Sequence, residues 1–224
     1  MSMDRKQAEA TLVEILDDLK GDRVVGMGFR LYGQVLATAC HCLPRAGGQI
    51  AFPDPDLPAP ALVAVRVRQP GALEGAFAVV VAADPCSDLA LLGVPPAAGP
   101  EAPGQPPSAG AIEDLIAGRE PALVEWAPPR EGRVFIHTHE KRWVEGIAAS
   151  SGISIWRPTD RIRRPTSGAP VFDGEGRVVG LVGHNDVRLP EATLCVLSEH
   201  LPGWALRGAR AAQAARDAAA PRPP

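Results

Sequence analysis

The spacing of hydrophobic positions changes once along this chain, close to residue 22. Over residues 3–20, apolar side chains recur at helical intervals between acids and bases, at Leu12, Ile15, Leu16 and Leu19. This spacing predicts an amphipathic helix that docks on the body of the protein. Gly21 and Asp22 would end the helix, so residues 1–22 form one expected unit.

From residue 23 onward, short runs of β-forming residues replace the helical pattern. A first group of strands is expected at 24–32, 34–39, 48–52, 61–69, 76–83 and 89–94. A second group is expected at 121–127, 133–139, 142–149, 152–157, 170–173, 177–183 and 192–197. Within the second group, the sequence Asp173-Gly174-Glu175-Gly176 predicts a hairpin turn.

A stretch rich in Pro, Gly and Ala at 95–118 separates the two groups and indicates a linker, with a short helix expected at 111–118. Six strands, a linker and about six more strands predict an all-β fold of two six-stranded antiparallel β-barrels, over 23–94 and 119–200. A short C-terminal helix and a disordered tail are expected over 201–224.

Composition and charge narrow the possible functions. The 224 residues are 46% hydrophobic, and the chain is long enough to bury a core without disulfide bonds or a structural metal. The 24 prolines and 23 glycines favour short elements joined by turns. Aromatic residues make up only 4% and the net charge is −3, which disfavours both base stacking and phosphate-backbone binding. Nucleic acid is therefore not an expected partner.

The N-terminal residues and the cysteines bear on location and metal binding. Residues 1–22 mix acids and bases, unlike a secretory signal, and no stretch approaches the roughly 20 apolar residues that cross a bilayer. The four cysteines form no CxxC pair, and Cys40-His41-Cys42 is too tight for a tetrahedral zinc site. We expect a cytoplasmic protein with reduced thiols, no membrane contact, no metal and no organic cofactor.

Three segments place chemically active side chains at the edges of predicted strands. In chain order they are ATACHC with His41, DPCSDLALL with Asp88 and PTSGAPVF with Ser167. A serine nucleophile needs a base within hydrogen-bond reach, and a histidine base needs a carboxylate that fixes its tautomer. Taken alone, the histidine is more typical of a packed core residue, the aspartate of a turn cap and the Ser-Gly pair of a turn. The three together, in this order, indicate a His-Asp-Ser triad between two barrels.

These segments resemble the motifs of the trypsin-like (chymotrypsin) serine peptidases, most closely the bacterial high-temperature-requirement and glutamyl-endopeptidase branches. The family's T-A-A-H-C is TACHC here, its D-P-x-x-D-L-A-L-L is DPCSDLALL, and its G-x-S-G-G-P is matched as SGAP from Ser167 onward. The separations also fit, with 47 residues from His41 to Asp88 and 79 from Asp88 to Ser167. Covering about 24–200, the resemblance implies a trypsin-like fold and a serine endopeptidase.

By this resemblance, His41 is the general base and acid, Asp88 orients it, and Ser167 forms an acyl-enzyme that water hydrolyses. In the family, the backbone N–H two residues before the serine joins that of the serine in the oxyanion hole. Pro165 stands at this position and has no N–H. We expect Ser167 N–H and Thr166 N–H to hold the oxyanion, in an enzyme that is weak or activated by a partner. The alternative is an inactive module of the same fold that only binds peptides.

Four residues are expected to contact substrate. In the family, the position of Arg161 often lines the pocket for the residue before the scissile bond. Its guanidinium would favour an acidic side chain, be neutralised by Asp160, or lie in a solvated basic loop. Val182, Gly183 and His184 would lie along the edge strand that pairs with substrate backbone.

The last expectations concern activation and partners. Arg23-Val24 looks like the cleavage point that activates secreted trypsins, but the strand that leads to His41 already occupies this region. We therefore expect no proteolytic activation. The expected partners are a peptide or protein substrate and a regulatory protein that contacts the N-terminal helix or the C-terminal tail.

Overall fold

The computed structural model describes residues 3–17, 22–32, 35–43, 64–84, 87–93, 114–115, 123–124, 132–148, 154–156, 159–185 and 193–197. The strand expected at 48–52 and the helix and tail expected at 201–224 lie outside these residues. Within the linker expected at 95–118, only Asp114 and Leu115 are described, and both are helical.

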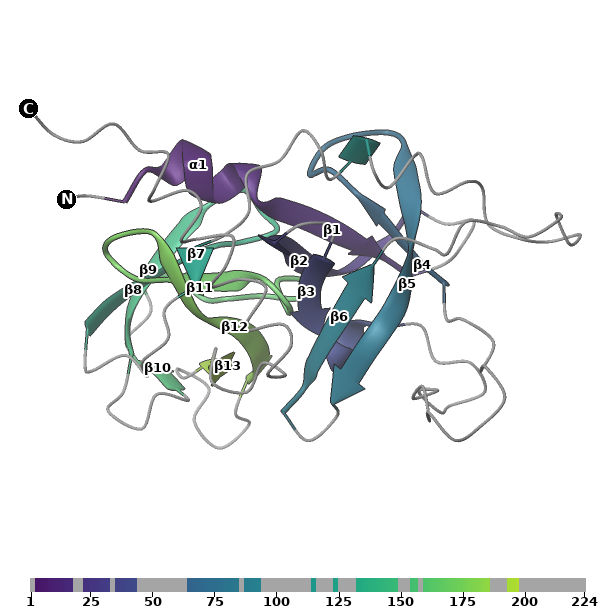
Figure 1. Ribbon diagram of the computed structural model, residues 1–224. Helices are drawn as coiled ribbons and strands as arrows, with labels where there is room; N and C mark the ends of the chain where they lie inside the picture. Colours follow the sequence, from purple (N-terminus) through teal and green to yellow (C-terminus); the bar gives the residue numbers. More distant parts are fainter. Residues whose placement is uncertain are drawn as a thin grey trace, which may run out of the picture.

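The first half of the chain forms a closed β-barrel (Figure 1). Its strands follow the order β1-β2-β3-β6-β5-β4, and pairing between β1 and β4 closes the ring. The strands are β1 (Leu12–Leu16), β2 (Val24–Tyr32), β3 (Val35–Ala39), β4 (Ala64–Arg68), β5 (Gly75–Asp84) and β6 (Leu89–Gly93). The enclosed core includes Val13, Ile15, Leu36, Val65, Val67 and Leu92. The expected six-stranded first barrel is confirmed, although with a different set of strands.

The helix expected over residues 3–20 is wrong beyond Ala10. Helix α1 covers Arg5–Ala10 only, and the carboxylate of its N-cap Asp4 accepts hydrogen bonds from two backbone N–H groups of the first turn. The following residues, Leu12–Leu16, form strand β1, and all five side chains are buried. Strand β1 pairs with β2 on one side and β4 on the other. This pairing satisfies the backbone and completes the barrel, so it overrides the helical spacing of the apolar side chains.

The second half of the chain forms a sheet of seven strands, in which six antiparallel strands pair in a ring because β11 pairs with both β8 and β12. The strand order is β11-β8-β9-β10-β13-β12-β7, with an additional pairing between β11 and β12. The strands are β7 (Leu123–Val124), β8 (Gly132–His137), β9 (Trp143–Ala148), β10 (Ser154–Trp156), β11 (Pro170–Phe172), β12 (Arg177–Asn185) and β13 (Thr193–Leu197). Strand β7 pairs with β12 in parallel, a direction that residue patterns alone do not reveal.

The two halves share a hydrophobic core. It joins side chains of the first barrel to side chains of the second sheet, among them Met27, Phe29, Leu91, Ile136, Phe172 and Leu181. Helix α1 adds polar contacts, because Glu9 accepts a hydrogen bond from the Trp143 indole N–H at 2.8 Å and the Arg5 guanidinium lies 5.4 Å from the centre of the same ring. The N-terminal segment thus runs from the second sheet, at α1, into the first barrel, at β1 (Figure 1).

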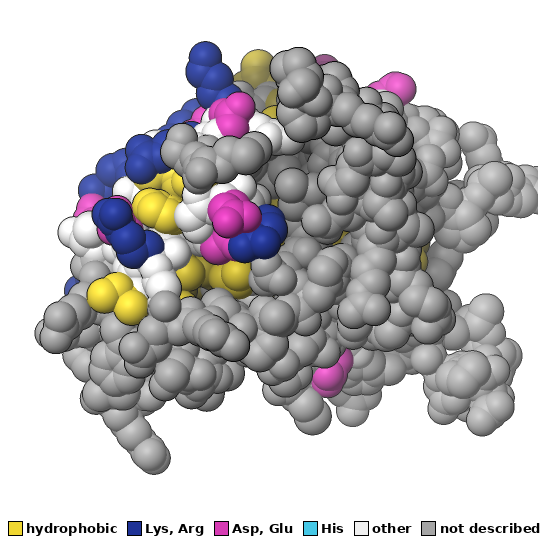
Figure 2. Space-filling model, turned by 60° about the vertical axis from the view of Figure 1, so that its left-hand side comes forward, with side chains coloured by type: hydrophobic (Ala, Val, Ile, Leu, Met, Phe, Trp, Pro, Cys, Tyr) yellow, Lys and Arg dark blue, Asp and Glu magenta, His cyan; other side chains and the backbone are white. Residues whose placement is uncertain are grey.

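The described surface of the second sheet carries charges of both signs. Figure 2 shows Lys and Arg side chains interspersed with Asp, Glu and hydrophobic side chains. Arg142 pairs with both Glu140 and Asp160, and Arg133 pairs with Glu145. Within the described residues, no helix has the length and apolar character needed to cross a membrane.

Candidate active site

His41 lies at the end of the first barrel, directly after strand β3. Strands β3 and β6 run antiparallel with Ala39 opposite Leu89, which brings the residues after β3 next to those before β6. The chain leaves β3 in a short 3-10 helix, η1 (Cys40–Cys42). Both cysteines of this turn are buried, whereas the His41 side chain between them retains 25% exposure. The turn therefore anchors the histidine and leaves its ring accessible.

Asp88 accepts three hydrogen bonds from the turn that carries His41. Its backbone carbonyl accepts from Cys40 N–H at 2.9 Å, and Oδ1 accepts from His41 N–H at 3.0 Å. Oδ2 lies 2.8 Å from His41 Nδ1. Because an ionised carboxylate only accepts, Nδ1 carries the proton and Nε2 is left as the basic nitrogen. Asp88 reaches this arrangement with φ = 55°, a left-handed conformation that aspartate tolerates better than most residues.

Ser167 lies in a tight turn of the second sheet that docks against the first barrel. Its carbonyl accepts from Met27 N–H at 2.7 Å and from the Cys42 thiol at 3.6 Å. Gly168 follows with φ = 85°, and a Cβ there would lie 2.0 Å from the Met27 carbonyl oxygen. Only glycine fits this contact. The turn therefore places the backbone of Ser167 in contact with Cys42, the residue after His41.

The Ser167 hydroxyl donates to the Gly183 carbonyl at 3.3 Å. Gly183 belongs to β12, and the residue before it, Val182, is hydrogen-bonded to the serine turn. The Val182 carbonyl accepts from Gly168 N–H at 2.7 Å, and Val182 N–H donates to the Ala169 carbonyl at 2.8 Å. The structure thus brings His41 and Asp88 into direct contact. It brings the backbone of Ser167 against Cys42, and it directs the serine hydroxyl to the edge of β12.

The thiol of Cys42 is packed between His41 and the serine turn. Burial raises its pKa to about 12, and the negative charge of Asp88 adds to the effect. The thiol is therefore protonated at neutral pH and is a poor nucleophile. It serves as a small packing group, because a Cβ on the neighbouring Gly26 would lie 2.4 Å from its sulfur. Cys40 and Cys42 are both free thiols.

The loop before Ser167 is closed by a hydrogen bond between its own backbone groups. The Arg164–Pro165 peptide is cis, and Thr166 N–H donates to the Arg163 carbonyl at 3.0 Å, closing a four-residue turn. The N–H expected to assist Ser167 is therefore engaged inside its own loop. The Thr166 side chain is buried, and its Oγ1 accepts from His139 N–H at 3.3 Å.

The residues expected to contact substrate occupy different settings. Arg161 is exposed, and its backbone N–H donates to Asp160 Oδ1 at 2.7 Å, while the Asp160 carboxylate also pairs with Arg142. Both backbone groups of Val182 are used by the serine turn, as described above, which removes them from pairing with substrate. Gly183 and His184 follow in β12.

Sequence reasoning missed a buried polar group behind the Thr166 loop. Glu14 of β1 is 5% exposed and pairs with Arg68 of β4 at 2.6 Å. Its other carboxylate oxygen lies 4.0 Å from Nδ1 of His139, the residue whose N–H holds Thr166. No linear pattern signals this group, because its members come from strands and a turn that are far apart in the chain. The expected strand over 133–139 ends at His137, so His139 lies in a turn.

Comparison with protein families identifies the family of this chain. Residues 26–181 match the trypsin-like peptidase domain. The chain belongs to this family. The match spans the segments of His41, Asp88 and Ser167, so the expected family is confirmed. A comparison with curated proteins finds no match.

Solved structures of bacterial serine proteases share the trypsin-like peptidase fold of this chain. The active form of the Rv3671c protease from M. tuberculosis is 18% identical with a TM-score of 0.52, over 95% of this chain and 88% of that one. The inactive form of the same protease is 17% identical with a TM-score of 0.52, over 96% and 97%. A serine endoprotease from Yersinia pestis is 14% identical with a TM-score of 0.56, over 88% and 64%.

Proposed function

We propose that this chain is a serine endopeptidase in which His41, Asp88 and Ser167 act as a catalytic triad. His41 Nε2 takes the hydroxyl proton as Ser167 Oγ attacks the scissile carbonyl, and Asp88 stabilises the imidazolium. The tetrahedral intermediate collapses, His41 protonates the leaving amine, and an acyl-enzyme remains. Water, deprotonated by His41, then attacks the ester, and the proton returns to Ser167 Oγ.

The contact between His41 and Asp88 carries this proposal. A carboxylate that accepts from both the backbone and the ring of one histidine fixes the orientation and the tautomer of that ring together. An aspartate that merely capped a turn would have no need of the second contact. The docking of the Ser167 carbonyl on Met27 supports the proposal, because it supplies a nucleophile from the opposite half.

The hydroxyl of Ser167 must turn from the Gly183 carbonyl towards His41 before attack. In the proposed mechanism, this move is a change of the Ser167 side-chain rotamer, which breaks the hydrogen bond to Gly183. In the proposed mechanism, Ser167 N–H supplies one oxyanion donor. Since Pro165 has none and Thr166 N–H is engaged, the second donor must come from a rearranged loop, and the resting enzyme is slow.

We also propose that no proteolytic cut activates the enzyme. Val24 begins β2 and lies opposite Leu16 of β1, while Asp17 N–H donates to the Arg23 carbonyl at 3.0 Å. A cut between Arg23 and Val24 would break the connection between two strands that remain paired in the barrel, so it would not free Val24 to reach another site. An active protein whose N-terminal residue is Val24 would contradict this proposal.

Labelling with a fluorophosphonate tests the mechanism, because this probe reacts with activated serines. We expect labelling of the wild-type chain that disappears in Ser167→Ala and His41→Ala. Ser87→Ala is the matched control, since Ser87 bonds to Asp84 and not to the triad, and it should label like the wild type. Labelling that persists in Ser167→Ala would contradict the proposal.

A peptide-binding module without catalysis is the second candidate. The engaged N–H of Thr166, the proline at 165 and the serine hydroxyl directed at Gly183 favour it. Its signature would be a complete lack of labelling, together with binding of casein-derived peptides that mass spectrometry recovers uncut. Ser167→Ala would leave that binding unchanged.

For the enzyme, we propose a preference for an acidic residue before the scissile bond. The Arg161 side chain is exposed and makes no ion pair with another described residue, while Asp160 is paired with Arg142. Its guanidinium is therefore available to a substrate carboxylate. Paired fluorogenic peptides with Glu or Gln at this position test the preference. Arg161→Gln should abolish the difference between them, whereas Arg163→Gln, another exposed arginine of the same loop, should not.

A further inference from the structure

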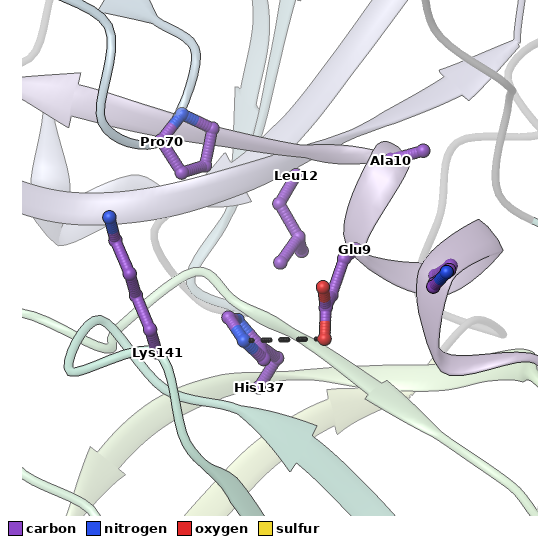
Figure 3. Close-up of a pocket in the computed structure, with 7 residues that line it drawn as sticks. Glu9, Ala10, Leu12, Pro70, His137 and Lys141 are labelled. Atoms are coloured by element: carbon purple, nitrogen blue, oxygen red, sulfur yellow. Dashed lines mark ion pairs between the residues drawn. The ribbon is translucent and has the colours of Figure 1, made fainter.

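An open pocket of about 430 Å³ lies where the N-terminal segment, the first barrel and the second sheet meet (Figure 3). Its walls come from α1, β1, the turn between β4 and β5, the end of β8 and the turn between β8 and β9. Its lining includes Lys6, Glu9, Ala10, Pro70, His137 and Lys141. None of the triad residues lines it, so the pocket is separate from the candidate active site.

The pocket has an excess of positive charge. Lys6 and Lys141 each bring an ammonium group, and neither makes an ion pair with another described residue. Lys141 extends towards Pro70, and a Cβ on the neighbouring Gly71 would lie 3.1 Å from its Nζ. The single carboxylate, Glu9, already accepts a hydrogen bond from the Trp143 indole. Two cations therefore face a cavity with one partly satisfied anion.

His137 leaves hydrogen-bonding capacity unused at the base of the pocket. Its Nε2 faces Glu9 Oε1 at 3.6 Å, which is longer than a hydrogen bond, and its Nδ1 has no partner among the described residues. Burial lowers the pKa of His137, although Glu9 opposes the shift, so the ring is neutral at pH 7. A neutral imidazole adds no charge to the pocket, and its Nε2, which faces Glu9, can donate to or accept from a ligand, whereas Nδ1 is buried.

We propose that this pocket binds a small organic anion with an apolar body. The anionic group would lie between Lys6 and Lys141, and the apolar body would pack on the half-buried side chains of Ala10 and Pro70. The volume falls within the range of ordinary small-molecule sites, in which an apolar lining and a few polar groups fix the ligand. An inorganic ion would leave the apolar wall uncovered, so the pocket fits an organic carboxylate better.

The pocket is mechanically connected to the serine loop, and this step rests on the proposed function. Lys141 N–H donates to the Thr138 carbonyl at 2.9 Å, and Thr138 N–H donates to Arg142 at 2.8 Å, which makes the β8–β9 turn one hydrogen-bonded unit. The same turn supplies His139 N–H to Thr166, the residue before Ser167. A ligand that holds Lys141 would therefore fix the turn that supports the oxyanion loop.

Calorimetric titration with 1-naphthoate, and with its neutral analogue 1-naphthamide, tests the binding site. We expect naphthoate to bind with a Kd of about 1 mM or tighter and naphthamide about tenfold more weakly. Lys141→Gln and Lys6→Gln should each weaken naphthoate binding about tenfold. Arg133→Gln removes a positive charge from an exposed position of β8 and should leave the affinity unchanged. Equal affinities for the acid and the amide, or no effect of either lysine variant, would overturn the site.

Hydrogen exchange tests the connection independently of catalysis. Saturating naphthoate should slow exchange of the His139 and Thr166 amides by about threefold or more in the wild type and not in Lys141→Gln. Unchanged exchange with naphthoate bound would overturn the connection and leave the binding site standing. Absence of fluorophosphonate labelling would contradict the proposed function alone, because neither measurement here depends on a reactive serine.

Discussion

The two sides of the candidate active site are prepared to different degrees. On the first barrel, His41 and Asp88 are joined through both ring and backbone, and the turn that carries His41 is fixed by buried cysteines. On the second sheet, the serine is docked by its carbonyl, but its hydroxyl and the N–H of Thr166 are engaged elsewhere. In the proposed mechanism, the base and the carboxylate that orients it are already in contact, whereas the groups that would stabilise the transition state are not yet in place. Control of such an enzyme would act on the second side.

The substitution with the largest expected effect disrupts the contact between His41 and Asp88. In Asp88→Asn, the amide offers one oxygen, so it cannot accept from both His41 N–H and Nδ1–H. The ring would turn or adopt the wrong tautomer, and the labelling rate of Ser167 should fall about 10⁴-fold, or about 5 kcal/mol. Asp84→Asn removes a nearby exposed carboxylate and should label normally. Equal labelling rates for Asp88→Asn and the wild type would show that the assembled pair is structural.

A second change breaks the joint between the two sides. Gly168→Ala places a Cβ in a left-handed conformation and against the Met27 carbonyl, so the serine turn must leave the first barrel. The free energy of unfolding should fall by about 3 kcal/mol or more, measured by urea denaturation. Gly174→Ala is the matched control, because no atom lies within 4 Å of its added Cβ. That variant should stay within about 0.5 kcal/mol of the wild type.

A third substitution adds a backbone N–H donor to the loop before Ser167. Pro165→Gly restores an N–H two residues before Ser167, where the family places an oxyanion donor. The labelling rate should rise about 10²-fold, or about 2.7 kcal/mol. Pro165→Ala also restores the N–H while keeping a side chain, so it should show most of the gain. A gain in the glycine variant alone would mean that loop flexibility, and not the donor, limits the reaction.

The smallest expected effect loosens the support of the loop. Thr166→Val keeps the shape of the side chain but leaves His139 N–H without its acceptor. If Thr166 positions the loop, kcat on a fluorogenic peptide should fall about tenfold with KM unchanged. Thr166→Ser keeps the hydroxyl and should restore the rate. A rise in KM with kcat unchanged would contradict the positioning role and place Thr166 in substrate binding.

The sequence predicted the features that are local in the chain. The segments around His41 and Asp88 each form a short continuous motif: strand β3 ends two residues before His41, and strand β6 begins directly after Asp88. The contact between the two side chains follows from antiparallel pairing of adjacent strands. For the same reason, most of the strands of the second sheet lie where alternation of residue types placed them.

The features that were missed depend on partners distant in sequence. The apolar pattern of residues 12–16 is compatible with either a helix or a fully buried strand. Only the pairing of β1 with β4 decides between the two. The hydrogen bond from Thr166 to Arg163 depends on the conformation of one turn. The pocket near Lys141 is formed by segments from three parts of the chain. A pattern of neighbouring residues does not predict contacts between segments that are far apart in the chain.

Strand β1 also determines where the chain can be shortened. The family match begins at residue 26, so a shortened protein could be designed to start there. The barrel, however, is closed by residues 12–16. Their removal would leave β2 and β4 as two open edges with unpaired N–H and C=O groups. Open edges of this kind recruit strands from neighbouring molecules, so the shortened protein should accumulate as aggregates.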